Sequence, residues 1–552
     1  MPLHNVDRRR RITKIAASAV LMVAALVIMT PVCRAEDKAP AMEYRAWAFQ
    51  TGKWNYLKKQ IPMARKAGMN RIQLSHNIIM DAQEMWEGPG ANIQRKLVEK
   101  CIAEAKKNDL KVDVWVHEFS GVPKKFTKDG KLVISDELWD WLRAKYVRLF
   151  DTVDGIDGLV LTFAETQYKL YSPDEVDSGG DTLAQFVKMI DIIAEECDKR
   201  GKVLIIRTFI HRPEELAVVQ NAVQRLAKDI KRNNIMLMAK CSPHDWSPYY
   251  PYETTFSNNP GFPLIMEMDS GQEYTGQSWI PHAEVEYTHQ VLSYVRSKGA
   301  VGAVTRVDRY DNTSVGTLNE VNLLAFSRFA QNPVLQPEDF WREWAADRYG
   351  ADAAPHVISA LKRTFDITNI IMFPLQQWVS DHSKVPTYDY AKSHILDFGG
   401  YSVGRWIDSP FYERSYEMMA DPDGDTFIMV AHEKELARKL MAASRADLEN
   451  AKPFLKEDAY SEFEQQFDIM ADMVDISELC QLAILKTMRY EKLRAGSSGS
   501  VEADALRKEI EAHLDALAVF EKEFGKKYGF VIFDNNTVRI GAFIDSVKAV
   551  VK

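Results

Sequence analysis

The sequence predicts an α/β protein: a (β/α)₈ TIM barrel followed by an all-helical C-terminal domain. Between residues 43 and 307, short apolar, β-rich runs alternate with longer amphipathic segments, which is the pattern of βα units around a parallel sheet. The β-rich runs number eight, as a TIM barrel requires, and the strand signal stops beyond about residue 336. We therefore expect a barrel over residues 36–336 and a helical domain over residues 337–552.

Each expected strand is a run of mostly apolar residues bounded by polar or turn-forming residues. The eight ranges are Glu43–Phe49, Asn70–Leu74, Lys111–Val116, Gly158–Phe163, Lys202–Thr208, Ile235–Lys240, Pro263–Met268 and Val301–Val307. An open, doubly wound sheet is the alternative. It is less favoured because no glycine-rich phosphate turn follows the first strand and because the count reaches eight.

The segments between the strands have helical spacing. Apolar Phe186, Ile190, Ile193 and Cys197 recur within residues 183–200, as on one face of a helix. In the C-terminal part no strand pattern interrupts the helical segments, and a Ser-Gly-Ser stretch over residues 496–500 predicts a loop between helices. The other expected helices are Pro213–Lys231, Phe340–Tyr349, Ala354–Ile367, His432–Leu448 and Ala503–Phe524.

The N-terminus has the pattern of an export signal. A basic stretch, Arg8–Lys14, precedes an uncharged apolar segment that runs from Ile15 to about Met29 and is followed by a small-residue cleavage candidate at Ala35. We expect a signal peptide over residues 1–35, a periplasmic or extracellular mature chain, and no membrane span in that chain. An uncleaved anchor, a twin-arginine signal and lipid attachment at Cys33 remain alternatives.

Composition narrows the function classes. The formal net charge is -8 with a pI near 5.9. No basic run after the leader alternates with aromatic residues, so we expect no nucleic-acid partner. The four cysteines of the mature chain are widely spaced and predict buried free thiols, with neither a disulfide framework nor a zinc site; they are Cys101, Cys197, Cys241 and Cys480.

Polar and aromatic residues gather where the expected strands end, which is where TIM-barrel enzymes have their active sites. Acids on several strand ends, with Trp and Tyr among them, suit glycosidic hydrolysis, in which one acid protonates the leaving oxygen and another carboxylate handles water or the anomeric carbon. The candidates are His117, Glu118, Glu165, Arg207, Lys240, Asp245, Trp246, Glu273, Tyr274 and Arg306.

Metal-dependent chemistry is the competing interpretation. Ligands could come from His76, His117, Glu118, His244 and Asp245. No His-x-His or His-Glu-x-x-His spacing is present, and an isolated barrel histidine more often positions substrate than binds a metal. We expect no metal and no cofactor.

Two motifs resemble those of the α-glucuronidases of glycoside hydrolase family 67. That family has a Lys before Pro-x-Asp-aromatic-x-Pro and, roughly thirty residues later, Gln-Glu-Tyr-x-Gly-Gln. Here Lys240 precedes Pro243-His-Asp-Trp-Ser-Pro248, and residues 272–277 read Gln-Glu-Tyr-Thr-Gly-Gln. The resemblance is best between about residues 158 and 277.

The resemblance implies an inverting hydrolase of α-linked uronosyl residues in an oligosaccharide or polysaccharide. Carried over residue by residue, it implies that Asp245 and Glu273 activate water, that Glu165 is the general acid, and that Arg207 and Lys240 receive the uronic acid. Two cations converging on one pocket are an independent reason to expect a carboxylate-bearing substrate. The family's dimers suggest a homodimer as one possibility.

The chain also departs from the family. The family's N-terminal β-rich domain is missing before the first expected strand, and Thr166 follows Glu165 where the family usually has Gly. The last strand brings Arg306, Asp308 and Arg309, which could recognise a second anionic group or pair with nearby acids. Another anionic or sulfated glycan, a uronate lyase activity and an inactive carbohydrate-binding barrel therefore stay open.

Each candidate also has a structural interpretation. Glu165 and Glu273 could be salt-bridged residues of the barrel rim, and Asp245 could cap the segment that follows it. Arg207 and Lys240 could neutralise neighbouring acids. Glu118, Glu267 and Asp269 belong mostly to structural networks, with Glu118 as the first substitute for Glu165.

Overall fold

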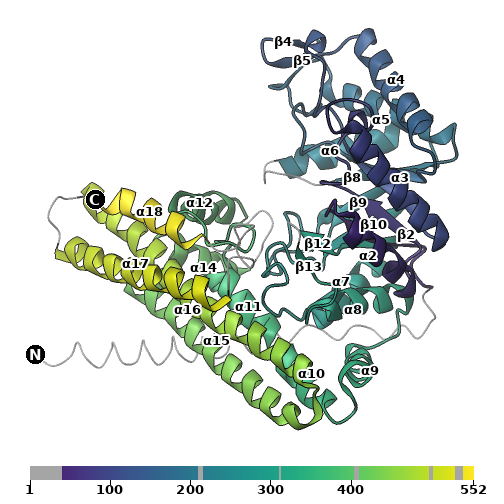
Figure 1. The fold of residues 1–552 in the computed structure, drawn as a ribbon. Helices are drawn as coiled ribbons and strands as arrows, with labels where there is room; N and C mark the ends of the chain where they lie inside the picture. Colours follow the sequence, from purple (N-terminus) through teal and green to yellow (C-terminus); the bar gives the residue numbers. More distant parts are fainter. Residues whose placement is uncertain (1–39, 209–214, 310–311, 403–408, 497–500, 529–538) are drawn as a thin grey trace, which may run out of the picture. The chain divides into compact units, whose positions relative to one another are not determined.

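Eight parallel strands close into a barrel in a computed structural model that describes residues 40–208, 215–309, 312–402, 409–496, 501–528 and 539–552 (Figure 1). Around the barrel the order is β1-β2-β3-β6-β8-β9-β10-β11, and β11 pairs with β1. The predicted fold class is confirmed. The signal peptide expected over residues 1–35 lies outside the described residues.

The barrel strands coincide with the predicted runs to within a residue or so at each end. Because both faces of each strand are covered, the runs are mostly apolar; every residue of β6 and β10 is buried. The strands are β1 (Tyr44–Phe49), β2 (Arg71–Leu74), β3 (Lys111–His117), β6 (Gly158–Thr162), β8 (Val203–Arg207), β9 (Ile235–Lys240), β10 (Leu264–Asp269) and β11 (Ala300–Arg306).

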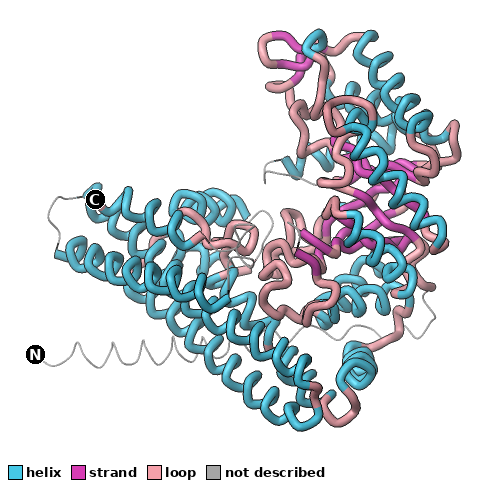
Figure 2. The backbone as a smooth tube through the Cα atoms, in the orientation of Figure 1, coloured by secondary structure: helices cyan, strands magenta, loops and turns pink. Residues whose placement is uncertain are grey.

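Helices follow the strands and cover the outside of the barrel, as Figure 2 shows. Sequence signals explain their starts: the Ser135 side chain accepts a hydrogen bond from Leu138 N at the start of α4, and Asp181 accepts one from Ala184 N at the start of α5. These helices are α2 (Trp54–Lys66), α3 (Ala91–Lys107), α4 (Asp136–Thr152), α5 (Thr182–Asp198), α6 (Glu215–Asp229), α7 (Val285–Ser297) and α8 (Glu320–Gln331).

Two small sheets lie in loops that follow barrel strands. Strands β4 (Thr127–Lys128), β5 (Lys131–Val133) and β7 (Val176–Asp177) form one. Strands β12 (Asp308–Arg309) and β13 (Asn312–Thr313) form an antiparallel pair directly after β11. Strand β12 therefore holds Arg309 beside the end of the last barrel strand.

The part after α8 is helical, as expected (Figure 1). The helix predicted over residues 354–367 is two helices, with Arg363 as a turn residue between them. The α-helices longer than one turn are α9 (Pro337–Tyr349), α10 (Ala354–Lys362), α11 (Thr364–Met372), α12 (Tyr388–Ser393), α14 (Pro410–Ala420), α15 (Gly424–Ala451), α16 (Glu457–Gly496), α17 (Val501–Tyr528) and α18 (Ile540–Val551).

The free-thiol prediction is confirmed for the four cysteines in the described ranges: each is buried and unbridged. In the same ranges, no helix combines the length and the apolar character that crossing a membrane demands.

Candidate active site

Glu165 follows β6 and is the most exposed of the three predicted catalytic acids. Its side chain is 34% exposed, and its Oε2 lies 3.2 Å from Nη1 of Arg207 and 4.0 Å from Nε2 of His117. Arg207 is the last residue of β8 and is fully buried. The guanidinium therefore holds one oxygen of Glu165 at the end of the barrel.

Arg207 also makes a two-pronged ion pair with Glu267, a buried residue of β10. The Nε–Oε2 distance is 2.6 Å and the Nη2–Oε1 distance is 3.1 Å. Its plane lies over the ring of Trp115, 4.7 Å from the centroid. Most of the N–H donors of Arg207 are thus directed at protein carboxylates. This fits the alternative interpretation in which Arg207 neutralises neighbouring acids.

Asp245 follows β9, and its carboxylate is held by two side chains. One oxygen forms an ion pair with Lys240, and the other accepts a 3.0 Å hydrogen bond from the Tyr274 hydroxyl. Burial alone would raise the pKa of Asp245, but Lys240 and His244 hold it well below its ordinary value. The side chain, 13% exposed, is a carboxylate in a left-handed backbone turn (φ 41°).

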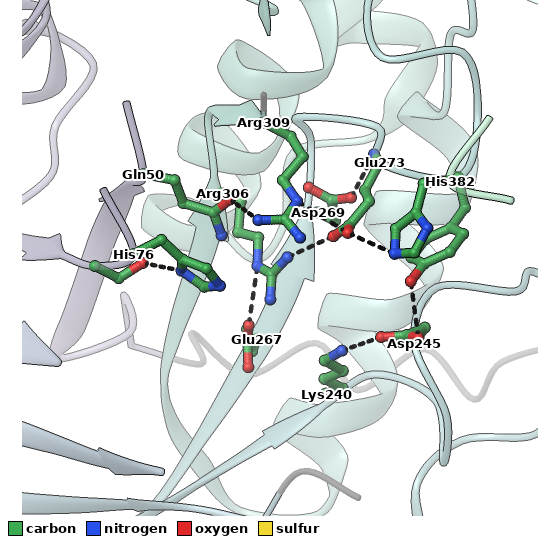
Figure 3. A network of polar contacts seen from close by, with 12 residues as sticks. Gln50, His76, Lys240, Asp245, Glu267, Asp269, Glu273, Arg306, Arg309 and His382 are labelled. Carbon is green, nitrogen blue, oxygen red and sulfur yellow. Dashed lines mark hydrogen bonds and ion pairs between the residues drawn. The ribbon is translucent and has the colours of Figure 1, made fainter. Parts of the chain in front are cut away.

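Glu273, in the loop after β10, is ion-paired with two arginines (Figure 3). Its Oε2 is 2.7 Å from Nη1 of Arg306 and its Oε1 is 2.9 Å from Nε of Arg309. Burial raises the pKa of Glu273, yet Arg309 and Arg306 more than offset this and keep it below the ordinary value. Only 4% of the side chain is exposed, so both oxygens are committed to these cations.

Asp269, at the end of β10, is hydrogen-bonded to the loop that carries Glu273. One carboxylate oxygen accepts a 2.7 Å hydrogen bond from the backbone N–H of Glu273, and the other is buried without a hydrogen-bond partner. Burial raises the pKa of Asp269 to about 6, against the opposing charge of Arg306. Arg306 also reaches Glu267 at 3.2 Å, so it links the Glu273 network to that of Arg207.

The Trp246 ring makes cation–π contacts with two of these cations. Lys240 Nζ lies 4.5 Å and the Arg306 guanidinium 5.2 Å from its ring. Burial lowers the pKa of Lys240, although Asp245 opposes this shift. The structure thus brings together eight of the candidate residues: Glu165, Arg207, Lys240, Asp245, Trp246, Glu273, Tyr274 and Arg306.

Glu118 does not join this group. Its buried carboxylate is bonded to Lys145 Nζ at 3.0 Å and to the Tyr146 hydroxyl, both on α4, so it ties β3 to a barrel helix. His117 is buried beside Glu165, with Nδ1 3.2 Å from the backbone oxygen of Met80. These contacts fit the structural network to which the sequence mostly assigned Glu118, and His117 lies next to the predicted acid.

The sequence did not predict His382 and Ser383, which come from the segment between α11 and α12. His382 Nε2 lies 3.4 Å from Oε1 of Glu273 (Figure 3), and its ring stacks on Tyr274 with centroids 5.0 Å apart. Ser383 is bonded to the loop that carries Glu273. No local pattern marks these two residues, because their role depends on a contact between distant parts of the chain.

The arrangement can donate and accept protons, orient water and hold anions. In the part of the chain that the structure describes, no three or more His, Cys, Asp or Glu side chains converge as a metal site would require. The fold and the site define a TIM-barrel protein with a carboxylate-lined, cation-rich and aromatic mouth.

Comparisons with known proteins agree with this architecture. A GH138 enzyme targeting pectin rhamnogalacturonan II is similar with a TM-score of 0.57 and 13% identity, over 89% of this chain and 63% of that chain. A mutant O-GlcNAc hydrolase of Thermobaculum terrenum gives a TM-score of 0.47 and 11% identity, over 92% and 94%. This chain thus spans less than two thirds of the first neighbour. No protein-family profile and no curated protein matches the sequence.

Proposed function

We propose that this protein is an exported glycoside hydrolase that cleaves α-linked uronosyl residues from polysaccharide-derived oligosaccharides with inversion. The observation that carries the proposal is the pairing of a partly exposed acid, Glu165, with a fixed carboxylate, Asp245, on two strand ends of one barrel mouth. Glycosidic hydrolysis needs such an acid and a second carboxylate. The neighbour that targets a pectin polysaccharide supports a glycan substrate.

Glu165 donates a proton to the leaving oxygen in this mechanism. Arg207 fixes one carboxyl oxygen of Glu165 and leaves the partly exposed side chain able to reach the substrate. Arg207 is therefore a positioning residue, because most of its N–H donors are directed at Glu267 and Glu165.

Asp245 orients and deprotonates the attacking water. Lys240 and the Tyr274 hydroxyl fix its two oxygens, and lone pairs on both remain to accept hydrogen bonds from water. Glu273 is less suited to the base role, because Arg306 and Arg309 each hold one of its oxygens and hardly any of it is exposed. Glu273 instead anchors the cationic side of the mouth, where Arg306 and Lys240 favour a substrate carboxylate.

The reaction is tested by proton NMR of the purified protein with a panel of α-uronosyl oligosaccharides. Initial release of the β-anomer by the wild type, lost in Glu165→Gln and Asp245→Asn, supports inversion with these roles. Glu99→Gln, an exposed acid of α3, is the matched control and should react like the wild type. Initial release of the α-anomer would indicate retention, and an unsaturated product absorbing in the ultraviolet would indicate a lyase. Absence of any product from the folded protein would overturn the hydrolase assignment.

Export and dimerisation are parts of the proposal with their own tests. Export predicts that the mature N-terminus, read by mass spectrometry after expression with the leader, begins close to residue 36. A homodimer predicts a mass near twice that of the mature chain in sedimentation. An intact leader or a monomer mass would refute the respective part.

A further inference from the structure

The four residues Asp381–Lys384 come from the helical part and are fixed at the barrel mouth. Ser383 Oγ accepts a 2.8 Å hydrogen bond from Gly276 N, and Gln277 Nε2 donates a 2.6 Å hydrogen bond to the backbone oxygen of His382. His382 and Ser383 both have left-handed backbones, with φ of 51° and 65°. Two successive non-glycine residues hold this costly conformation only where the surroundings impose it, and such positions concentrate at ligand-binding sites.

The segment presents His382 to the mouth in a fixed orientation. Its Nδ1 lies 2.6 Å from Asp381 Oδ1, and Asp381 is in turn ion-paired with Arg539 at the start of α18. Its other edge lies 3.4 Å from Glu273, beyond the usual range for a strong hydrogen bond, and 28% of the side chain is exposed. The ring therefore reaches solvent beside Glu273 while its rotation is restricted.

Positive charge gathers around the same segment. Burial lowers the pKa of Lys384; Asp381 opposes the shift, and the cations Arg539 and Arg309 lower it further. Arg309 is bonded to Glu273, whose other oxygen is bonded to Arg306, so the Glu273 charge is shared between two arginines. An anion bound beside these cations would interact favourably with them.

We infer that Arg309, His382 and Lys384 form a second subsite of the mouth, which binds a carboxylate or sulfate group on the sugar next to the one that is cleaved. The inference rests on the proposed function, because it places a further sugar of the same substrate beside Glu273. The helical part is then a component of the substrate site and makes the protein selective for oligosaccharides with adjacent anionic sugars. Arg207 contributes little to this selectivity, since its donors serve Glu165 and Glu267.

The subsite is tested by binding, without turnover, in a Glu165→Gln background. Calorimetry would compare tetragalacturonate, a sulfated carrageenan tetrasaccharide and neutral maltotetraose. We expect one of the charged probes to bind in a salt-sensitive manner, and Lys384→Gln or His382→Gln to weaken that binding about tenfold or more, as loss of a charge-assisted hydrogen bond should. Which charged probe binds more tightly distinguishes the carboxylate from the sulfate.

The matched control is Lys392→Gln, which removes another lysine of the helical part, ion-paired with Glu491 at 2.7 Å. It should leave the affinity unchanged, and thermal melting checks that every variant is folded. Equal affinity of the parent and both subsite variants, or no binding of either charged probe, would overturn the subsite. Loss of affinity in the variants supports the subsite even if the wild type cleaves no glycosidic bond. If the wild type cleaves the substrate and the variants bind with unchanged affinity, the subsite is overturned and the hydrolase proposal is not.

Discussion

Ser383 Oγ donates a 2.8 Å hydrogen bond to the backbone carbonyl oxygen of Glu273, 110 positions earlier in the chain. The same hydroxyl accepts a hydrogen bond from Gly276 N, and Ser383 is almost fully buried. One side chain thus satisfies two buried backbone groups of the loop that carries a predicted catalytic acid. The geometry of the mouth depends on a segment outside the barrel.

We expect Ser383→Ala to destabilise this loop. The substitution leaves a buried N–H and a buried carbonyl without their partner, which costs about 1–3 kcal/mol for an unsatisfied group. Urea unfolding should show a loss of that size, together with reduced turnover. Ser393→Ala is the matched control, since the exposed Ser393 hydroxyl bonds within α12, to Tyr390 O at 3.3 Å. Equal losses in the two variants would contradict the role given to Ser383.

Removing the Arg306 charge should be far more damaging than removing a surface arginine. Arg306→Met leaves the buried carboxylates Glu267 and Glu273 with one cation fewer, and breaking a buried pair in this way costs about 3–5 kcal/mol. Arg328→Met breaks an exposed pair with Glu343 and should cost about 1 kcal/mol or less. Melting temperatures of the two variants provide the comparison. A similar small shift for both would show that Glu267 and Glu273 are stabilised by their other partners.

The barrel could be predicted closely because its signal is local. Strand β9 has the predicted bounds, Ile235–Lys240, since burial on both faces makes such a strand a continuous apolar run. The strands β12 and β13 could not be predicted, because two-residue strands carry no periodicity. The break at Arg363 was missed because the apolar spacing continues through it from α10 into α11.

For the candidate site, the sequence predicted which residues lie at strand ends but not which of them pair with one another. Strand ends place Arg207, Lys240 and Asp245 at one mouth, but which acid each cation pairs with depends on the order of strands around the ring. Arg207 on β8 pairs with Glu267 on β10, with β9 between them, and no local pattern indicates this pairing. His382 could not be found at all, since its contact with Glu273 joins segments that no local pattern relates.

The pairing of β1 with β11, which closes the barrel, should be weakened by any side chain larger than hydrogen at Gly302. A Cβ atom there would lie 2.8 Å from the backbone oxygen of Tyr44 and 2.5 Å from its Cβ, closer than such atoms come. We expect Gly302→Ala to destabilise the protein by about 1–3 kcal/mol, the usual cost of overpacking. Gly424→Ala, at a helix start with open space around it, is the control and should be near neutral. An unchanged melting temperature for Gly302→Ala would mean that the strand pair can separate locally.

Glu253 gives the stability a defined pH dependence. Burial raises the pKa of its carboxyl from 4.5 to about 7, and the 2.8 Å hydrogen bond from Thr255 N opposes this only in part. The folded protein binds the proton more tightly than the unfolded chain, so this group's contribution to stability is complete below about pH 4.5 and is lost as the pH rises through 7.

Glu253→Gln removes this loss because the amide cannot ionise. The variant should gain on the wild type by about 3 kcal/mol in the free energy of unfolding between about pH 4.5 and pH 7.5, since each pKa unit is worth about 1.4 kcal/mol. Urea unfolding at several pH values measures the difference. Glu417→Gln, which changes an exposed acid of α14, should show no comparable pH-dependent gain. A constant difference between Glu253→Gln and the wild type over this range would show that the buried carboxyl does not take up a proton on folding.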